Sequence, residues 1–266
     1  MEGIVIMIGY YGGKSKLIKY IEPLIPQSNE VNGFVDLFVG GGSVSDMLVK
    51  HYQSGIINDI DFNLIRFYLA SKSDSEGVKK FILEHRESVT LDDVRRFKSD
   101  ISTDTNEMSV AFKYFTLIYT MFSNKPYSTP TEKNLRLYKK RNIDADFDKI
   151  SKTLRCVEIM NRNFKDVVYD DMFYYCDPPY FKVSHNTYYG YNGQNHKSFN
   201  HIDFFNWITE ISRRNKVMIS YEDSEEIRDM YKDWTFVEIP KKSSYFNSRT
   251  KEQKYKVTNE LLIKNY

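Results

Sequence analysis

The chain has 266 residues, which is enough for one large domain or for one domain that carries an insertion. Charged residues make up 28% of it but the formal net charge is only +2, so a uniformly polycationic protein is excluded and any nucleic-acid-binding surface must be local. No apolar run approaches about 18 residues, no signal-peptide pattern opens the chain, and there is no CxxC pair or His cluster, which predicts a soluble cytoplasmic protein without a metal site.

The first elements are a strand, a glycine-rich turn and a helix. Ile4–Ile8 is a short apolar strand, Gly9–Ser15 follows it with a lysine among its glycines, and apolar residues then recur at helical spacing over 17–21. A phosphate-binding P-loop has four residues between its glycines, whereas the outer glycines of this turn enclose fewer, so nucleotide hydrolysis is disfavoured. The pattern indicates instead a backbone turn that closes over a small ligand, with Lys14 nearby.

A second glycine turn follows the next strand. Phe34–Phe38 is an apolar strand that runs into Gly40–Gly42, and a helix begins at about Ser43. Ser43 and Asp46 have the spacing of a capping box. The glycines do not have the spacing of a dinucleotide fingerprint, so that class of site is disfavoured. The turn brings backbone close to a ligand, or else it is a tight connection that binds nothing.

The strand Gly55–Asp59 ends in an acid. An aspartate about twenty residues after a glycine turn is well placed to accept hydrogen bonds from both hydroxyls of a ribose. A helix N-cap is the alternative function of Asp59.

Between residues 62 and 152 the pattern changes to helices separated by polar breaks. Apolar residues repeat at helical spacing over Phe62–Leu69, Val78–Leu83, Leu91–Phe97 and Met108–Met121. The basic stretch behind them contains Asn124, Lys125, Lys133, Arg136, Lys139, Lys140 and Arg141. We interpret residues 62–152 as an insertion whose basic end meets DNA phosphates, and a merely solvated charged surface is the alternative.

The sheet resumes after the insertion. Its remaining elements are a strand at Val157–Met160, the segment Asn163–Asp166, a strand at Phe173–Cys176, a polar loop over Phe181–Ser198 that includes Tyr188, an amphipathic helix over Asn200–Arg214, a strand at Val217–Ser220, a basic and aromatic segment over Lys241–Lys256 that includes Arg249, and a last strand at Glu260–Ile263.

The segment Asp177-Pro178-Pro179-Tyr180 has the strongest chemical signature of the chain. Two prolines stop the preceding strand and hold a rigid turn at its carboxyl end, where open α/β sheets bind ligands. An aromatic amino group is a poor nucleophile, and acceptors such as the Asp177 carboxylate and the Pro178 carbonyl would draw its nitrogen toward tetrahedral geometry. The Tyr180 ring would hold the base by stacking. The alternative is a strand-ending turn with a solvated aspartate.

The order of the motifs GYYGGK, FVDLFVGGGS, INDID, NFKD and YYCDPPY resembles the DNA adenine methyltransferase (Dam) family, over roughly residues 4–61 and 154–266. The resemblance implies an α/β fold with a Rossmann-like seven-stranded methyltransferase sheet and a mostly helical target-recognition insertion. The catalytic domain would then be residues 1–61 and 153–266, and the target-recognition domain residues 62–152.

The same resemblance implies S-adenosylmethionine as cofactor, S-adenosylhomocysteine as product and double-stranded DNA as partner, with no metal and no membrane. The implied catalytic residues are Asp177, Pro178, Pro179 and Tyr180. The implied cofactor-binding residues are Tyr10, Gly12, Lys14, Asp36, Phe38, Gly40, Asp59, Phe164, Asp166 and Asp177. The expected DNA-binding residues are Asn124, Lys125, Lys139, Lys140, Arg141, Tyr188 and Arg249. A restriction endonuclease encoded elsewhere is a candidate partner, and the chain is expected to be a monomer or a weak dimer.

The predicted reaction is methyl transfer to the 6-amino group of an adenine flipped out of the duplex. Amino methylation of cytosine or of RNA is an alternative, as is a catalytically silent DNA-binding module, although a mere binder needs neither glycine turn nor DPPY. Methylation of a cytosine ring carbon is disfavoured because neither Cys156 nor Cys176 follows a proline. The segment Tyr119–Asn134 is shorter than the matching hairpin of GATC-recognising members, so the recognised DNA sequence is not predicted.

Overall fold

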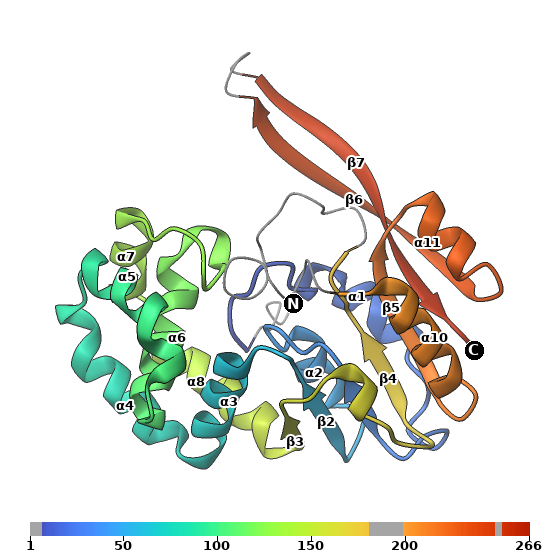
Figure 1. Cartoon of the computed structure of the whole chain (residues 1–266), viewed down its shortest axis with the longest axis horizontal. Helices are drawn as coiled ribbons and strands as arrows, with labels where there is room; N and C mark the ends of the chain where they lie inside the picture. The colour runs from blue at the N-terminus through green and yellow to red at the C-terminus, as the bar shows by residue number, and fades with distance from the viewer. Residues whose placement is uncertain (1–6, 181–198, 248–251) are drawn as a thin grey trace.

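We describe a computed structural model of the chain, which covers residues 7–180, 199–247 and 252–266 (Figure 1). Its centre is a seven-stranded sheet with the order β3-β2-β1-β4-β5-β7-β6. The strands are β1 (Phe34–Asp36), β2 (Gly55–Asn58), β3 (Val157–Met160), β4 (Phe173–Cys176), β5 (Lys216–Glu222), β6 (Thr235–Asn247) and β7 (Glu252–Lys264). This is the predicted α/β sheet.

The order of the strands locates the ligand-binding edge. The first five strands are parallel, and β7 is antiparallel to both β5 and β6. From β1 the chain builds outward to β2 and β3, and then returns to the other side of β1 with β4. Open α/β sheets bind ligands at the carboxyl ends of the strands where the order reverses, which here lies between β1 and β4.

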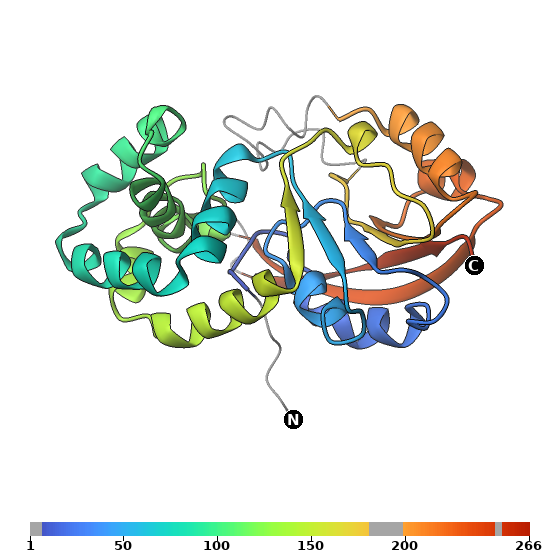
Figure 2. The ribbon, with the colours of Figure 1, turned by 90° about the horizontal axis from the view of Figure 1, so that it is seen from below.

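Both faces of the parallel strands are buried, which explains why these strands are continuous apolar runs. On one face Val35, Tyr174 and Val217 belong to a core that also contains Phe204 and Ile208 of α10 (His201–Ile211). On the other face alternate strand residues join a larger core with α2 (Ser43–Leu48) and α1 (Ile18–Ile21). A short helix α11 (Glu225–Met230) packs beside α10 (Figures 1 and 2).

Six helices lie between β2 and β3 in the sequence and beyond β3 in space (Figure 2). They are α3 (Phe62–Ser73), α4 (Ser75–His85), α5 (Leu91–Asp100), α6 (Glu107–Thr120), α7 (Glu132–Lys139) and α8 (Ile143–Arg155). The four predicted helices agree with α3 to α6, whereas α7 and α8 were not predicted. The larger core continues without a break from the sheet into these helices, through residues such as Phe67 and Phe115.

The main difference from the prediction lies at the carboxyl end of the chain. The last strand was expected over Glu260–Ile263 alone, but β7 pairs with β6 along thirteen residue pairs from Thr235↔Lys264 to Asn247↔Glu252. The resulting hairpin projects from the sheet (Figure 1). Because Glu222, the last residue of β5, pairs with Glu260, the rest of the hairpin extends past the carboxyl ends of the parallel strands.

Two local predictions, a strand at Ile4–Ile8 and a capping box at Ser43, do not agree with the structure. The expected strand at Ile4–Ile8 is not present in its described part, where Met7 and Ile8 form a bend, and the remainder lies outside the described residues. The expected capping box is wrong, because the N-cap of α2 is Gly42, and the Asp46 carboxylate accepts a hydrogen bond from the Thr153 hydroxyl of α8 at 2.9 Å instead. In the part of the chain that the structure describes, none of the helices has the length and apolar character to cross a membrane.

Candidate active site

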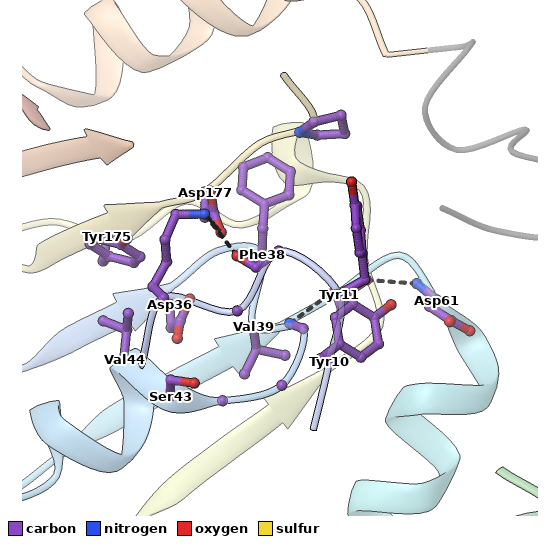
Figure 3. Close-up of a pocket in the computed structure, with 18 of the residues that line it drawn as sticks. Tyr10, Tyr11, Asp36, Phe38, Val39, Ser43, Val44, Asp61, Tyr175 and Asp177 are labelled. Atoms are coloured by element: carbon purple, nitrogen blue, oxygen red, sulfur yellow. Dashed lines mark hydrogen bonds and ion pairs between the residues drawn. The ribbon is translucent and has the colours of Figure 1, made fainter. Parts of the chain in front are cut away.

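A pocket of about 810 Å³, including its open mouth, lies where the strand order reverses (Figure 3). It is lined by Tyr10, Tyr11, Gly12, Gly13, Lys14, Asp36, Phe38, Val39, Gly40, Gly41, Gly42, Ser43, Val44, Asp59, Ile60, Asp61, Tyr175, Asp177, Pro179 and Phe199. Both glycine turns, the acid after β2 and the DPPY turn therefore meet at one site.

The second glycine turn forms the floor of this pocket. Gly40 and Gly42 have φ angles of 45° and 69°, in the left-handed region that glycine adopts without strain. A Cβ atom on Gly42 would be strained at this φ angle and would lie 1.8 Å from the Cε atom of Met7, whose side chain would have to move. The Ile8 N–H donates to the Gly41 carbonyl, which holds the amino-terminal segment against the turn.

Asp36 ends β1 beneath the turn and is almost completely buried. Its carboxylate accepts a hydrogen bond from the Ser45 hydroxyl at 2.6 Å. Burial raises the pKa of Asp36 to about 7, against the lowering effect of Ser45, and the nearby Asp177 raises it further. A cationic ligand would therefore stabilise the ionised form of this carboxylate.

Asp59 does not have the helix-capping function that the sequence offered as its alternative. Its Oδ2 atom accepts from the Gly40 N–H at 3.0 Å and its Oδ1 atom from the Asp61 N–H at 2.9 Å, so it fixes the glycine turn, while the helix N-cap of α3 is Asp61. Asp59 also lines the pocket. Desolvation by the surrounding protein raises the pKa of Asp59 to about 6.

The DPPY turn closes the pocket from the β4 side. The Asp177 carboxylate faces Asp36 and Phe38 in Figure 3, and its Oδ2 atom accepts a hydrogen bond from the Lys14 ammonium at 2.5 Å. Lys14 belongs to the first glycine turn and is 5% exposed. Pro179 lines the pocket, Pro178 is buried, and the Tyr180 hydroxyl donates to the Glu260 carboxylate of β7.

An aromatic cluster supports the opposite wall. The Phe38 ring lies within 6.4 Å, centroid to centroid, of the rings of Phe164, Phe199 and Phe204. Phe199 lines the pocket and was not predicted, whereas Phe164 lies behind Phe38 and is not among the lining residues. Asp166 is exposed and does not line the pocket either.

The chemistry of the lining residues fits S-adenosylmethionine. The pocket is lined by the four carboxylates of Asp36, Asp59, Asp61 and Asp177 and by the ammonium group of Lys14. This excess of negative charge favours a ligand that carries a sulfonium and an ammonium group, and it disfavours a polyphosphate. The Ser43 hydroxyl is buried and has no hydrogen-bond partner among the described residues, so a polar ligand atom would satisfy it. The aromatic wall would pack against a purine.

The expected DNA-binding residues do not form one exposed basic surface. The Lys125 ammonium lies 3.9 Å from the centroid of the Tyr11 ring, and Lys125 is only 7% exposed. Its burial lowers its pKa to about 8. Asn124 has a φ of 54° in the turn after α6 and its side chain lies against Gly9. Both residues are therefore beside the pocket.

The remaining basic residues of the insertion differ in their contacts. The Arg141 guanidinium binds both carboxylate oxygens of Asp146, at 2.5 and 2.8 Å, and lies 3.8 Å from the centroid of the Tyr119 ring. Lys139 donates to the Glu87 carbonyl at 2.6 Å, and Lys140 is exposed. Tyr188 and Arg249 lie outside the described residues.

Sequence reasoning missed two buried acids. Asp61 caps α3 and accepts hydrogen bonds from the hydroxyls of Tyr114 and Tyr127, at 3.0 and 3.3 Å, so it ties the pocket to the helical insertion. Its position one residue before an apolar helical pattern is a readable N-cap signal. Glu260 contacts Tyr180 across 80 residues of sequence and has no local signal.

Comparison with known proteins identifies the family. Residues 10–247 match the model of the D12 class N6 adenine-specific DNA methyltransferases. The chain is 24% identical to the type II methyltransferase M1.LlaDCHI of Lactococcus lactis subsp. cremoris, over 96% of this chain and 93% of that protein. It is also 24% identical to the type II methyltransferase M.CviBI of Paramecium bursaria Chlorella virus NC1A, over 98% of this chain and 99% of that protein. With the DPPY turn and the glycine turn lining one pocket, the match over most of its length shows that the chain belongs to the N6 adenine-specific DNA methyltransferases of the D12 class.

Proposed function

We propose that this DNA methyltransferase binds S-adenosylmethionine in the pocket between β1 and β4 and methylates an adenine that has left the base stack. The observation that carries the proposal is that Asp177 lines the same pocket as Asp36 and the glycine turn Gly40–Gly42. A methyl donor held on the glycine turn and an amino group held at Asp177 would then be adjacent, as a direct transfer requires.

The cofactor would supply an activated methyl group on its sulfonium. Asp36 and Asp59 would bind its cationic and hydroxyl groups, because both carboxylates lie in the pocket and the ionised form of each is destabilised by burial until a partner arrives. Phe38 and Phe199 would contact the adenine ring of the cofactor. Lys14 and Tyr10 would close the site above the glycine turn.

Asp177, Pro178 and Tyr180 would act on the target base. The Asp177 carboxylate and the Pro178 carbonyl would accept hydrogen bonds from the two N–H groups of the 6-amino group. Tyr180 would stack on the adenine ring, which contributes roughly 1–3 kcal/mol per base. A base inside the duplex cannot reach the pocket, so the adenine must be flipped out. The transfer leaves a proton on the nitrogen, and Asp177 is the acceptor beside it.

We assign target recognition to residues 62–152, and a further DNA contact to the hairpin of β6 and β7. The hairpin extends on the pocket side of the sheet, and its sequence over 241–256 is rich in lysine. Lysines of the hairpin, together with exposed cations of the insertion such as Lys140, would bind DNA phosphates near the flipped base. The type II names of the relatives favour membership of a restriction-modification system, with an endonuclease as the partner.

The test is methyl transfer from labelled S-adenosylmethionine to duplex DNA of mixed sequence, followed by nucleoside analysis. We expect labelled N6-methyl-2′-deoxyadenosine from the wild type, and about 10²–10³-fold slower formation of it by Asp177→Ala at equal bound cofactor. Asp170→Ala is a matched control, because Asp170 is an exposed aspartate near β4 that pairs with Arg214.

Two other results would contradict the proposal. Labelled methylcytosine would mean that the proposed cofactor site is right but that the target base is cytosine. Transfer to RNA but not to DNA would reject duplex DNA as the substrate.

A further inference from the structure

Glu260 is a buried acid beside the DPPY turn with no assigned function. It lies on β7, where it pairs with Glu222 of β5 and Ile239 of β6, and it is 1% exposed. A carboxylate removed from water is costly unless donors satisfy it. The contacts of the Glu260 side chain therefore indicate its function.

Those contacts join it to the catalytic turn. The Glu260 Oε1 atom accepts the hydrogen bond of the Tyr180 hydroxyl and lies 3.8 Å from the Lys14 Nζ atom. The same Nζ atom lies 2.5 Å from Asp177 Oδ2 and 5.0 Å from the centroid of the Tyr180 ring. Four side chains from three distant parts of the sequence thus form one cluster, in which Lys14 and Glu260 are buried and Asp177 and Tyr180 are partly buried.

The geometry constrains two groups that would touch the target base. The Tyr180 ring can swing about its side-chain bonds, but a hydrogen bond from the hydroxyl at its far end holds the ring in one position beside the DPPY turn. The Lys14 ammonium stands between two carboxylates, so its charge is shared rather than held by Asp177 alone. A shared lysine competes less strongly with an adenine amino group for the Asp177 oxygens.

We propose that Glu260 is a positioning residue for the transfer reaction, which holds the Tyr180 ring in place for stacking and offers the Lys14 ammonium a second carboxylate besides Asp177. This inference rests on the proposed function, because it takes Tyr180 as the stacking surface for the flipped adenine. A merely structural acid would behave differently, since its loss would lower stability and leave the kcat of the folded enzyme unchanged.

The experiment compares Glu260→Gln with the wild type on DNA that contains the site the wild type methylates. The glutamine keeps the shape and an acceptor for Tyr180 but removes the charge that attracts Lys14. We expect kcat to fall by about tenfold or more, the equivalent of one charged hydrogen bond. The Kd of S-adenosylmethionine should stay within about twofold, because Glu260 is not among the residues that line the cofactor pocket. A fluorescent 2-aminopurine at the target position should be less quenched by the Tyr180 ring.

A matched control and a partner variant separate position from stability. Glu238→Gln makes the same change on the neighbouring strand β6, where the carboxylate is half-exposed and pairs with Arg228, so its kcat should equal that of the wild type. Tyr180→Phe keeps the ring and deletes the hydroxyl. Both changes act on the same hydrogen bond, which Glu260→Gln weakens and Tyr180→Phe removes, so the double variant should lose less activity than the product of the two single losses.

Each outcome decides between the alternatives. Wild-type kcat and quenching in Glu260→Gln, or losses that multiply in the double variant, would overturn the inference. Should Glu260→Gln not fold, Tyr180→Phe with unchanged kcat would overturn it, and a kcat lowered at constant cofactor Kd would support it. A wild type that transfers no methyl group to DNA adenine would reject the proposed function and this inference with it, whereas an active wild type beside an equally active Glu260→Gln would reject this inference alone.

Discussion

The candidate active-site pocket and the basic end of the helical insertion use charged residues in opposite ways. In the pocket, acids that are largely removed from water, such as Asp36 and Asp177, surround one buried lysine and have room for a ligand. In the insertion, Arg141 is neutralised by Asp146 and Lys139 by a backbone carbonyl, so two of the expected phosphate contacts hold the insertion together.

The difference shows when a charged residue in a sequence predicts a function and when it does not. A catalytic turn must present a carboxylate at a defined point, so its sequence is nearly fixed by the chemistry. A cation that meets a phosphate can stand at many positions, and a cation in a basic stretch can equally cap or pair within the fold. The predictions below test this contrast, from the largest expected effect to the smallest.

The catalytic function of Asp177 should produce the largest loss. Asp177→Ala removes an acceptor that acts on the developing charge of the amino group, so kcat should fall by about 10²–10³-fold, similar to the loss of one group from a preorganised site. Cofactor affinity, measured by calorimetry, should be retained. Near-normal turnover would remove Asp177 from the mechanism.

Asp61 should control stability rather than chemistry. Asp61→Ala deletes an N-cap and leaves the buried Tyr114 hydroxyl without its acceptor, so the free energy of unfolding should fall by about 2–3 kcal/mol. Asp61→Asn keeps an N-cap oxygen and should lose less. Denaturant unfolding measures both, and equal losses would show that the cap carries none of the effect.

Cofactor affinity should depend on pH because of Asp36 and Asp59. Burial raises the pKa of Asp36 to about 7 and desolvation raises that of Asp59 to about 6, so both are increasingly protonated in the free protein as the pH falls. A cationic ligand binds the ionised forms, and each carboxylate that must lose a proton weakens binding by about tenfold per pH unit below its pKa.

The Kd of S-adenosylmethionine should therefore fall as the pH rises from 5 to about 7 and level off above it. Calorimetry in buffers with different protonation enthalpies should show protons released on binding near pH 6. Asp36→Asn should flatten the upper part of this dependence. A Kd independent of pH would mean that the cofactor does not contact these carboxylates.

The smallest effects separate the two kinds of cation in the insertion. Lys140→Ala removes an exposed charge, so DNA binding should weaken, and the slope of log K against log salt should become shallower by about 1, with stability unchanged. Arg141→Ala removes a paired and stacked side chain, so stability should fall by about 1 kcal/mol while the salt slope is constant. The reverse assignment would overturn the contrast drawn above.

Most of the sheet and the catalytic turn could be predicted from the sequence because their signals are local. The strands from β1 to β5 are short apolar runs bounded by glycine, proline or acids, and DPPY is contiguous. The extent of β6 and β7 was missed because the sequence over 241–256 is mostly polar and shows no alternation of apolar residues. The Tyr180–Glu260 and Asp46–Thr153 contacts join residues far apart in the chain, and no single segment records them.

The attachment of the insertion to neighbouring strands has a consequence for folding. Its helices leave from β2 and return through β3, and these two strands are paired along Gly55↔Val157 to Asn58↔Met160. If the intervening chain were unfolded, closing so long a loop would cost about 4 kcal/mol of entropy before the first strand pair formed. A collapsed helical insertion brings the two ends together in advance, so the sheet acquires its edge strand at the rate at which the insertion folds.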